Sequence, residues 1–92
     1  MSIETLEPVE LAAALDLTAV AALLADVKAR RGAPLILDGS NVQRIGGLCL
    51  QVLLAAHDAW RVDGCEFQLK ASDALAAGLR QMGAEQLLEE AA

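Results

Sequence analysis

The stretch Leu35–Leu54 decides the fold, and it reads LILDGSNVQRIGGLCLQVLL. It starts with an unbroken apolar trio that ends at Asp38, which is typical of a strand in a covered sheet. The turn-forming residues 39–41 then carry the chain out of that strand. The apolar residues that follow Gly46 and Gly47 predict a buried helix that begins at one of these two glycines.

Hydrophobic periodicity extends this pattern over the rest of the chain. Thr18 or Asp16 is placed to cap the first helix, Ser72 is placed to cap the third, and Gly83 suits a left-handed helix end. Strands that alternate with helices predict an α/β domain whose mainly parallel sheet has about four strands covered by three to four helices. The elements expected are strands at 9–11, 35–38 and 67–70, with a further short strand at the N-terminal end, and helices at 18–31, 47–62, 72–82 and 85–90.

The helix expected at 47–62 is apolar over more than one side. Leu48 and Val52 lie outside its main apolar stripe, so we expect this helix to be mostly enclosed. Trp60 is the sole tryptophan, and its place on the apolar side assigns it to the core or the core margin rather than to an interface. The main stripe consists of Leu50, Leu53, Leu54, His57 and Trp60.

The composition describes one domain over residues 1–92, in which residues 1–8 and 89–92 are expected to fray. A hydrophobic share of 55% with only 2% aromatic residues means that Leu, Val, Ile and Ala build the core, which suits helices packed on a sheet. The net charge of −6 argues against a nucleic-acid partner, because phosphate binding needs a basic stripe and the seven Lys and Arg residues are scattered.

The chain shows no basic and apolar leader, and no window approaches the roughly 18 uninterrupted apolar residues that a membrane span requires. We therefore expect a cytoplasmic protein that does not insert into a membrane directly. In a reducing compartment, Cys49 and Cys65 are expected to be small buried hydrophobes rather than disulfide partners.

The sequence offers little catalytic chemistry. Cys49 and His57 lie on one predicted helix about 12 Å apart along its axis, so they cannot form a nucleophile and base pair. Two cysteines and one histidine at these spacings supply too few ligands for a metal site. There is also no phosphate-binding loop of the G-x-x-x-x-G-K type. We expect no enzymatic activity, no metal and no cofactor.

The central stretch resembles the STAS domain, the fold of the bacterial anti-sigma factor antagonists, whose corresponding segment typically reads L-D-L-S-x-V-x-x-I-D-S-S-G-L-x-x-L-L. Residues 15–17 are similar to the family's G-x-L-D, and residues 79–88 are similar to its closing L-x-x-x-G-L-x-x-L-L. In order and spacing, the resemblance covers roughly residues 9–90. The matching positions of the central segment are Asp38, Ser40, Val42, Ile45, Leu50, Leu53 and Leu54.

The chain departs from the family pattern where the predicted helix begins. The family's Asp-Ser-Ser-Gly is Gly46-Gly47-Leu48-Cys49 here. The first serine of that motif takes the phosphate in phosphorylated family members, and Gly47 has no hydroxyl to modify. Ser40 is the nearest hydroxyl, and it is better placed to satisfy the backbone of the turn, as Asp38 is to orient the loop.

The resemblance implies a non-enzymatic protein-interaction module that docks through the loop and helix start at 39–50. The Gly46-Gly47 pair itself suits a partner contact, a mere tight turn or a small anion. The departures look most like short STAS proteins encoded with chemotaxis genes, so the expected partner is a signalling protein, either a kinase or a chemotaxis component. The alternative is the small STAS subunit of a lipid-transport ABC ATPase complex, and the oligomeric state stays open, a dimer included. The expected partner-binding residues are Asp38, Ser40, Asn41, Gln43, Arg44, Ile45, Gly46, Gly47 and Leu48.

Overall fold

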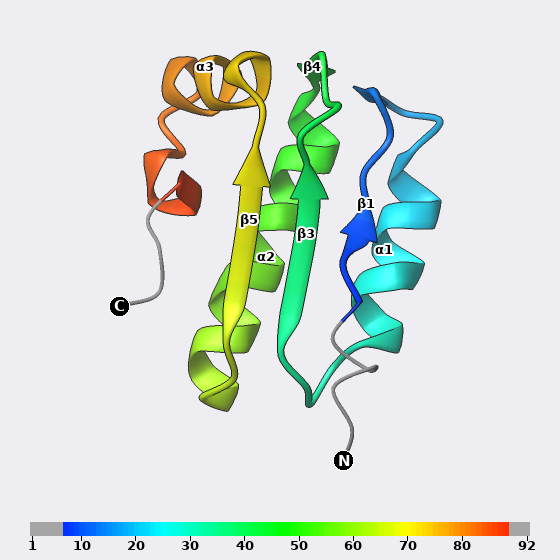
Figure 1. Cartoon of the computed structure of the whole chain (residues 1–92), viewed down its shortest axis with the longest axis vertical. Coiled ribbons are helices and arrows are strands. Elements are labelled where there is room, and N and C mark those ends of the chain that lie inside the picture. Colours follow the sequence, from blue (N-terminus) through cyan, green and yellow to red (C-terminus); the bar gives the residue numbers. More distant parts are fainter. Residues whose placement is uncertain (1–6, 89–92) are drawn as a thin grey trace.

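The computed structural model describes residues 7–88, and it confirms the predicted α/β architecture (Figure 1). The two-residue strands β2 and β4 lie at positions for which no strand was predicted, because residues 14–15 and 44–45 show no alternating apolar pattern. The expectation of fraying at 1–6 and 89–92 lies outside the described residues. The elements are β1 (Val9–Glu10), β2 (Ala14–Leu15), α1 (Val20–Ala29), β3 (Leu35–Gly39), β4 (Arg44–Ile45), α2 (Gly47–Asp63), β5 (Phe67–Ala71), α3 (Asp73–Gln81) and the 3₁₀ helix η2 (Glu85–Leu88).

Every strand pairing among these elements is parallel, as the alternation of strands and helices predicted. The main sheet has the order β1-β3-β5, so the apolar strand at the start of the deciding stretch lies in its centre. There Leu37 stands opposite Leu69 of β5 on one side and Val9 of β1 on the other. A second small sheet pairs β2 with β4 and places Leu15 opposite Ile45.

Two layers make up the molecule. Helices α1 and α2 lie side by side behind the main sheet and run antiparallel to its strands, while α3 lies at the end toward which β5 points (Figure 1). The shortest dimension is 19 Å, which matches one sheet and one layer of helices at about 10 Å per layer. The end of β3, the β4 segment and the start of α2 meet at the same end of the molecule as α3.

The core lies between the sheet and the helices, and aliphatic side chains dominate it, as the composition predicted. Strand β3 alternates between buried residues that face the helices and half-buried residues on the opposite face. Trp60 is 0% exposed, which confirms its assignment to the core. The other side chains with almost no exposed surface are Leu15, Leu35, Leu37, Leu53, Leu75, Leu79, Val42 and Cys49.

Helix α2 corrects one expectation, because it is not mostly enclosed. Leu48 is 51% exposed and Val62 is 78% exposed, while Val52 is only half-buried. Among residues 7–88, the packing neighbours of α2 include α1, β5 and η2, and they leave Leu48 and Val62 exposed. The apolar width seen in the sequence therefore reflects an outward-facing apolar strip, and not burial on all sides.

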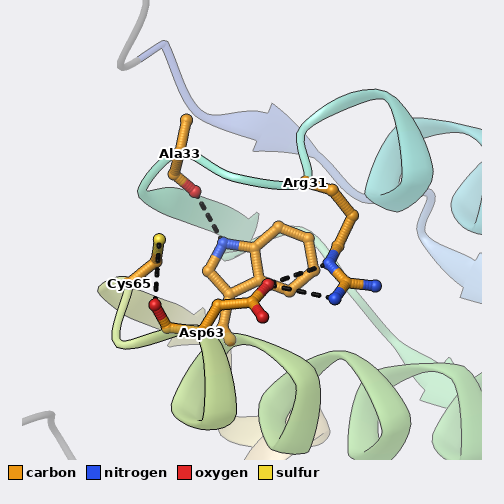
Figure 2. Close-up of polar contacts among 5 residues, drawn as sticks. Arg31, Ala33, Asp63 and Cys65 are labelled. Atoms are coloured by element: carbon orange, nitrogen blue, oxygen red, sulfur yellow. Dashed lines mark hydrogen bonds and ion pairs between the residues drawn. The ribbon is translucent and has the colours of Figure 1, made fainter.

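Polar contacts of Trp60 join the C-terminal ends of α1 and α2 (Figure 2). Its indole N–H donates a 2.6 Å hydrogen bond to the carbonyl oxygen of Ala33, which follows α1. The guanidinium of Arg31 lies 5.7 Å from the Trp60 ring centroid and forms a 3.0 Å ion pair with Asp63. The indole is thus both the largest buried side chain and the anchor of the α1–β3 turn.

The helix ends follow the predictions in part. Ser72 caps α3, and Gly64 and Gly83 adopt left-handed conformations with φ of 72° and 73° after α2 and α3. The prediction that Thr18 or Asp16 caps α1 is wrong. The Asp16 carboxylate instead accepts hydrogen bonds from the amide and hydroxyl of Thr18, in a turn that ends before the helix begins.

Candidate functional site

The candidate site is the loop surface, which we define as residues 38–48, from the end of β3 to the first turn of α2. It begins with a tight turn in which the Asp38 carboxylate accepts a 3.0 Å hydrogen bond from the amide of Ser40 and a 2.7 Å hydrogen bond from its hydroxyl. These two bonds hold the pKa of Asp38 below its ordinary value, and Lys70 on the neighbouring strand lowers that pKa further. Asp38 thus orients the loop, as predicted.

The middle of the loop is held by hydrogen bonds to Ser72, the N-cap residue of α3. Val42 is 1% exposed, and its carbonyl oxygen accepts a 2.6 Å hydrogen bond from the hydroxyl of Ser72. The carbonyl oxygen of Gly39 accepts from the amides of both Val42 and Ser72, each at 3.1 Å. The loop is therefore held on the cap of α3, although Ser72 lies about 30 positions further along the chain.

The second half of the loop is held by residues 13–15, which include β2. The amide of Gln43 donates to the carbonyl oxygen of Ala13 at 2.7 Å, and the amide of Gly46 donates to that of Leu15 at 2.8 Å. Both partners belong to the segment before α1, which thereby forms a floor under the loop. Because hydrogen bonds hold the backbone of both halves of the loop, its exposed side chains start from fixed backbone positions.

Helix α2 begins at Gly47, with Gly46 as its extended N-cap residue. No side chain caps this end, so the amides of the first turn point outward with no side-chain partner among residues 7–88. A Cβ atom added at Gly47 would meet nothing within 4 Å, whereas one at Gly46 would lie 3.6 Å from the Leu15 carbonyl oxygen. The start of α2 therefore has free space around Gly47.

A hollow of about 450 Å³ adjoins this helix start. Leu17 and Leu48, which are 74% and 51% exposed, line it together with Asp16 and the two glycines. Arg44 reaches across to Asp16 in an exposed ion pair of 3.6 Å. The site thus combines two exposed leucines, a charge pair and accessible backbone, which suits contact with another macromolecule better than covalent chemistry.

The predicted site residues gather on this surface but differ in access. Ser40, Asn41, Gln43, Arg44, Gly47 and Leu48 are exposed, whereas Asp38, Ile45 and Gly46 are half-buried. The Ser40 hydroxyl is directed to Asp38, and the Ile45 side chain lies under the loop, where its Cγ2 atom would be 3.1 Å from a Cβ atom at Gly78. The exposed set is the part that a partner can reach.

Sequence reasoning missed the contribution of the segment before α1. Asp16 and Leu17 lie beside Gly46 and Gly47, although about 30 residues separate them in the chain. A signal was present, because residues 15–18 read Leu-Asp-Leu-Thr and residues 37–40 read Leu-Asp-Gly-Ser, and both form the same carboxylate-to-hydroxyl turn. Their proximity depends on the β2–β4 pairing, which the sequence does not announce.

The cysteines and the histidine take no part in this site. Cys49 is 1% exposed and its thiol lies 3.5 Å from the Asp16 carbonyl oxygen; burial raises the pKa of that thiol. Cys49 and Cys65 stand at opposite ends of α2, about 24 Å apart by its rise per residue, so they cannot pair. His57 packs edge-on against Phe67 with centroids 5.5 Å apart. Within residues 7–88, no group of three His, Cys, Asp or Glu side chains could hold a metal ion.

Comparison with known proteins gives one match. The family model described as "Mlab, STAS domain" matches residues 5–89, which is nearly the whole chain. Neither the comparison with curated proteins nor that with solved structures returned a match. Among residues 7–88, no helix is both long and apolar enough to cross a membrane. The parallel sheet, the two-helix layer and the family match together show that the chain belongs to the STAS domain family and is an anti-sigma factor antagonist-like STAS module.

Proposed function

We propose that this chain is a non-enzymatic protein-interaction module of a bacterial signalling pathway, and that it docks its partner through the loop surface. The observation that carries the proposal is the open start of α2. There, Gly47 has free space around it, and Leu17 and Leu48 expose apolar area on either side. Small residues beside exposed apolar side chains permit close approach of a partner backbone.

The rigidity of the loop supports the same proposal. Ser72 and the β2 segment hold the loop backbone through hydrogen bonds of 2.6 to 2.8 Å, so little conformational entropy remains to be lost on docking. The exposed residues Asn41, Gln43 and Arg44 add polar side chains to the same loop surface. Protein interfaces usually combine apolar and polar side chains.

Binding at this surface is not switched by phosphorylation at the helix start. The family's phosphorylated serine corresponds to Gly47, and the nearest loop hydroxyl, that of Ser40, donates to Asp38 at 2.7 Å. The module is therefore permanently competent to bind, and control rests with its abundance or with its partner. We expect that partner to be a kinase or a chemotaxis component, in line with the resemblance to short chemotaxis-associated STAS proteins.

The second candidate is an accessory subunit of a lipid-transport ABC ATPase complex. The lack of a hydroxyl at Gly47 also suits this role, because a permanently assembled subunit needs no phosphorylation switch. Both roles would use the loop surface, so the identity of the captured protein decides between them. Co-purification with a histidine kinase or chemotaxis protein supports the first role, and co-purification with an ABC ATPase supports the second.

The test is affinity capture from a native extract with wild-type protein and with Gly47→Asp and Arg44→Asp. Loss of one captured protein in both variants, with unchanged circular dichroism, is the expected result. Ala77→Asp and Arg80→Asp are matched controls, because both residues are exposed on α3 and lie outside the loop surface as defined by residues 38–48. Capture that is equal for all five proteins would contradict docking through the loop surface.

A further inference from the structure

A second hollow lies outside the loop surface, in the groove between α1 and α2. It has a volume of about 420 Å³ and begins beside Leu48, which it shares with the loop surface. It extends along the whole of α1, which is about 14 Å or nearly three helical turns, and reaches Arg31 just beyond that helix. Its lining on the first side is Val20, Leu24 and Val27 of α1 with Arg31 just after that helix, and its lining on α2 is Leu48, Gln51, Val52, Ala55, Ala56, Ala59 and Trp60.

The groove has apolar walls that reach solvent. Leu24 is 38% exposed and Leu48 is 51% exposed on its two sides. Val62 continues the strip on α2, with spacing that keeps it on the same side as Leu48, Val52 and Ala55, and it is 78% exposed. Five large hydrophobic side chains are exposed among residues 7–88. Four of them lie on α1, on α2 or in the segment before α1, and the fifth, Met82, follows α3.

Buried residues and small side chains form the floor of the groove. Ala56 and Trp60 are buried beneath it, at 3% and 0% exposure, and alanines at 55 and 59 keep the α2 wall shallow. The hydrogen bond from the Trp60 indole to the carbonyl oxygen of Ala33 holds this side chain in place, so the indole does not move into the groove. Small side chains along a helix allow a second helix to approach closely.

The charge of the groove is confined to one end. Arg31 is the one charged residue in the lining and lies just after the end of α1, and Lys28 is exposed in the last turn of that helix (Figure 2 shows Arg31 against Asp63). The groove therefore carries no carboxylate in its lining, in a chain whose net charge is −6. Both α1 and α2 also end there, so their negative dipole ends lie beside the cations (Figure 1).

We propose that the groove binds an amphipathic helix of about three turns from a partner protein, oriented antiparallel to α1 and α2, with an acidic residue of its first turn on Arg31. The N-terminal end of such a helix is positive and favours acidic residues, so both its dipole and its side chain match this end of the groove. The inference rests on the proposed function and deepens it, because Leu48 makes the groove a continuation of the loop surface.

Two other occupants fit less well. A second copy related by a two-fold axis would set groove against groove and leave a void, whereas a helix presents the convex ridge that a groove accepts. It would also pair two chains of charge −6. A free acyl chain would stay half in water, because the walls at Leu24 and Leu48 are themselves exposed, while small-molecule sites enclose most of their ligand.

The test uses a synthetic stapled helical peptide as probe, about four turns long, with leucines spaced at i, i+4 and i+7 and two glutamates in its first turn. Binding is followed by Trp60 fluorescence and by amide chemical shifts of the full chain. We expect shifts along α1 and α2, and about a tenfold weaker affinity for Ala55→Glu, because the added charge would be buried without a partner. Ala77→Glu is the matched control, since Ala77 is an exposed alanine on α3. Equal affinity for both variants would overturn the proposal.

Charge orientation gives an independent test. A peptide with lysines in place of the glutamates should bind wild-type protein several-fold more weakly, and Arg31→Gln should abolish this preference. Asp63→Asn is the control, because it breaks the same 3.0 Å ion pair but keeps the guanidinium, and it should preserve the preference. No preference in the wild type, or its loss in Asp63→Asn alone, would contradict the assigned orientation.

Further outcomes separate the alternatives. Concentration-dependent dimerisation that Ala55→Glu abolishes would assign the groove to a second copy, and equal shifts with dodecanoate alone would assign it to an acyl chain; either result overturns the proposal. Gly47→Asp distinguishes the two surfaces, because it should weaken native capture but leave peptide binding unchanged. Peptide failure with Gly47-dependent capture intact would refute the groove alone, and the reverse would refute the loop surface alone.

Discussion

The hydroxyl of Ser72 donates a 2.6 Å hydrogen bond to the carbonyl oxygen of Val42. The hydroxyl oxygen of Ser72 also accepts a 3.0 Å hydrogen bond from the amide of Leu75, so one side chain both caps α3 and holds the middle of the loop surface. An element late in the chain thereby sets the geometry of the candidate site.

Replacing Ser72 with alanine should lower the free energy of unfolding by about 1–2 kcal/mol, because a helix cap and a loop anchor are lost together. Chemical denaturation measures this change. Amide exchange at Val42 and Gln43 should also accelerate, since the loop loses its support. Ser40→Ala is the control: it removes an exposed hydroxyl whose bond stays within its own turn, so a similar loss of stability there would argue against the double role of Ser72.

Gly39 and Gly47 should respond in opposite ways to alanine. A Cβ atom at Gly39 would lie 2.7 Å from the Leu75 side chain and 2.9 Å from the Lys70 carbonyl oxygen, so Gly39→Ala should destabilise the fold by about 1–3 kcal/mol. A Cβ atom at Gly47 meets nothing within 4 Å, and alanine there favours the helix, so Gly47→Ala should be neutral or stabilising by up to about 1 kcal/mol. Thermal unfolding of both variants checks this contrast.

The two equivalent turns predict a pair of carboxylate titrations. Hydrogen bonds from Ser40 lower the pKa of Asp38, and hydrogen bonds from Thr18 lower the pKa of Asp16. Ser40→Ala should therefore raise the pKa of Asp38 alone, and Thr18→Ala that of Asp16 alone, as measured by carboxyl carbon NMR. A folded-state pKa below the unfolded value contributes stability above the unfolded pKa that is lost as pH falls through the folded pKa. The stability difference between wild type and either variant should accordingly shrink in acid.

The fluorescence of Trp60 should report on the packing at the C-terminal ends of α1 and α2. Because it is 0% exposed, its fluorescence should be blue-shifted in the folded protein and move to longer wavelength on unfolding. Trp60→Phe removes the 2.6 Å hydrogen bond to Ala33 and leaves a void, so it should cost on the order of 2 kcal/mol. Urea denaturation followed by circular dichroism measures the loss, and a variant as stable as wild type would contradict the anchoring role.

Placing a serine at position 47 tests the proposal that the loop surface is not switched by phosphorylation. The space around Gly47 predicts that Gly47→Ser folds as the wild type does. Incubated with ATP and a kinase that phosphorylates STAS domains of this kind, wild-type protein should take up no phosphate at residue 47, while Gly47→Ser should become labelled. Mass spectrometry locates the label. Stoichiometric labelling of wild-type protein at Ser40 would show that the loop surface is switched after all.

Local pattern was sufficient for the larger elements. The apolar trio before Asp38, the i and i+4 spacing of α1 and α2, and the capping serine at 72 each report an interaction within a few residues, so they can be read from sequence. The two-residue strands β2 and β4 could not, since they exist only through pairing with each other. For the same reason, Asp16 and Leu17 were missed beside the predicted residues Gly46 and Gly47.

The sequence by itself therefore determined the α/β class, the place of the central strand, the start of α2 at Gly47 and the absence of a hydroxyl there. Tertiary structure decided which apolar residues of α2 are buried and which face outward. The same apolar stripe is consistent with burial on every side or with a second surface, because periodicity records which side chains share a face of a helix and not what lies against that face. Only the placement of α1 and the sheet around α2 left Leu48, Val52 and Val62 toward solvent.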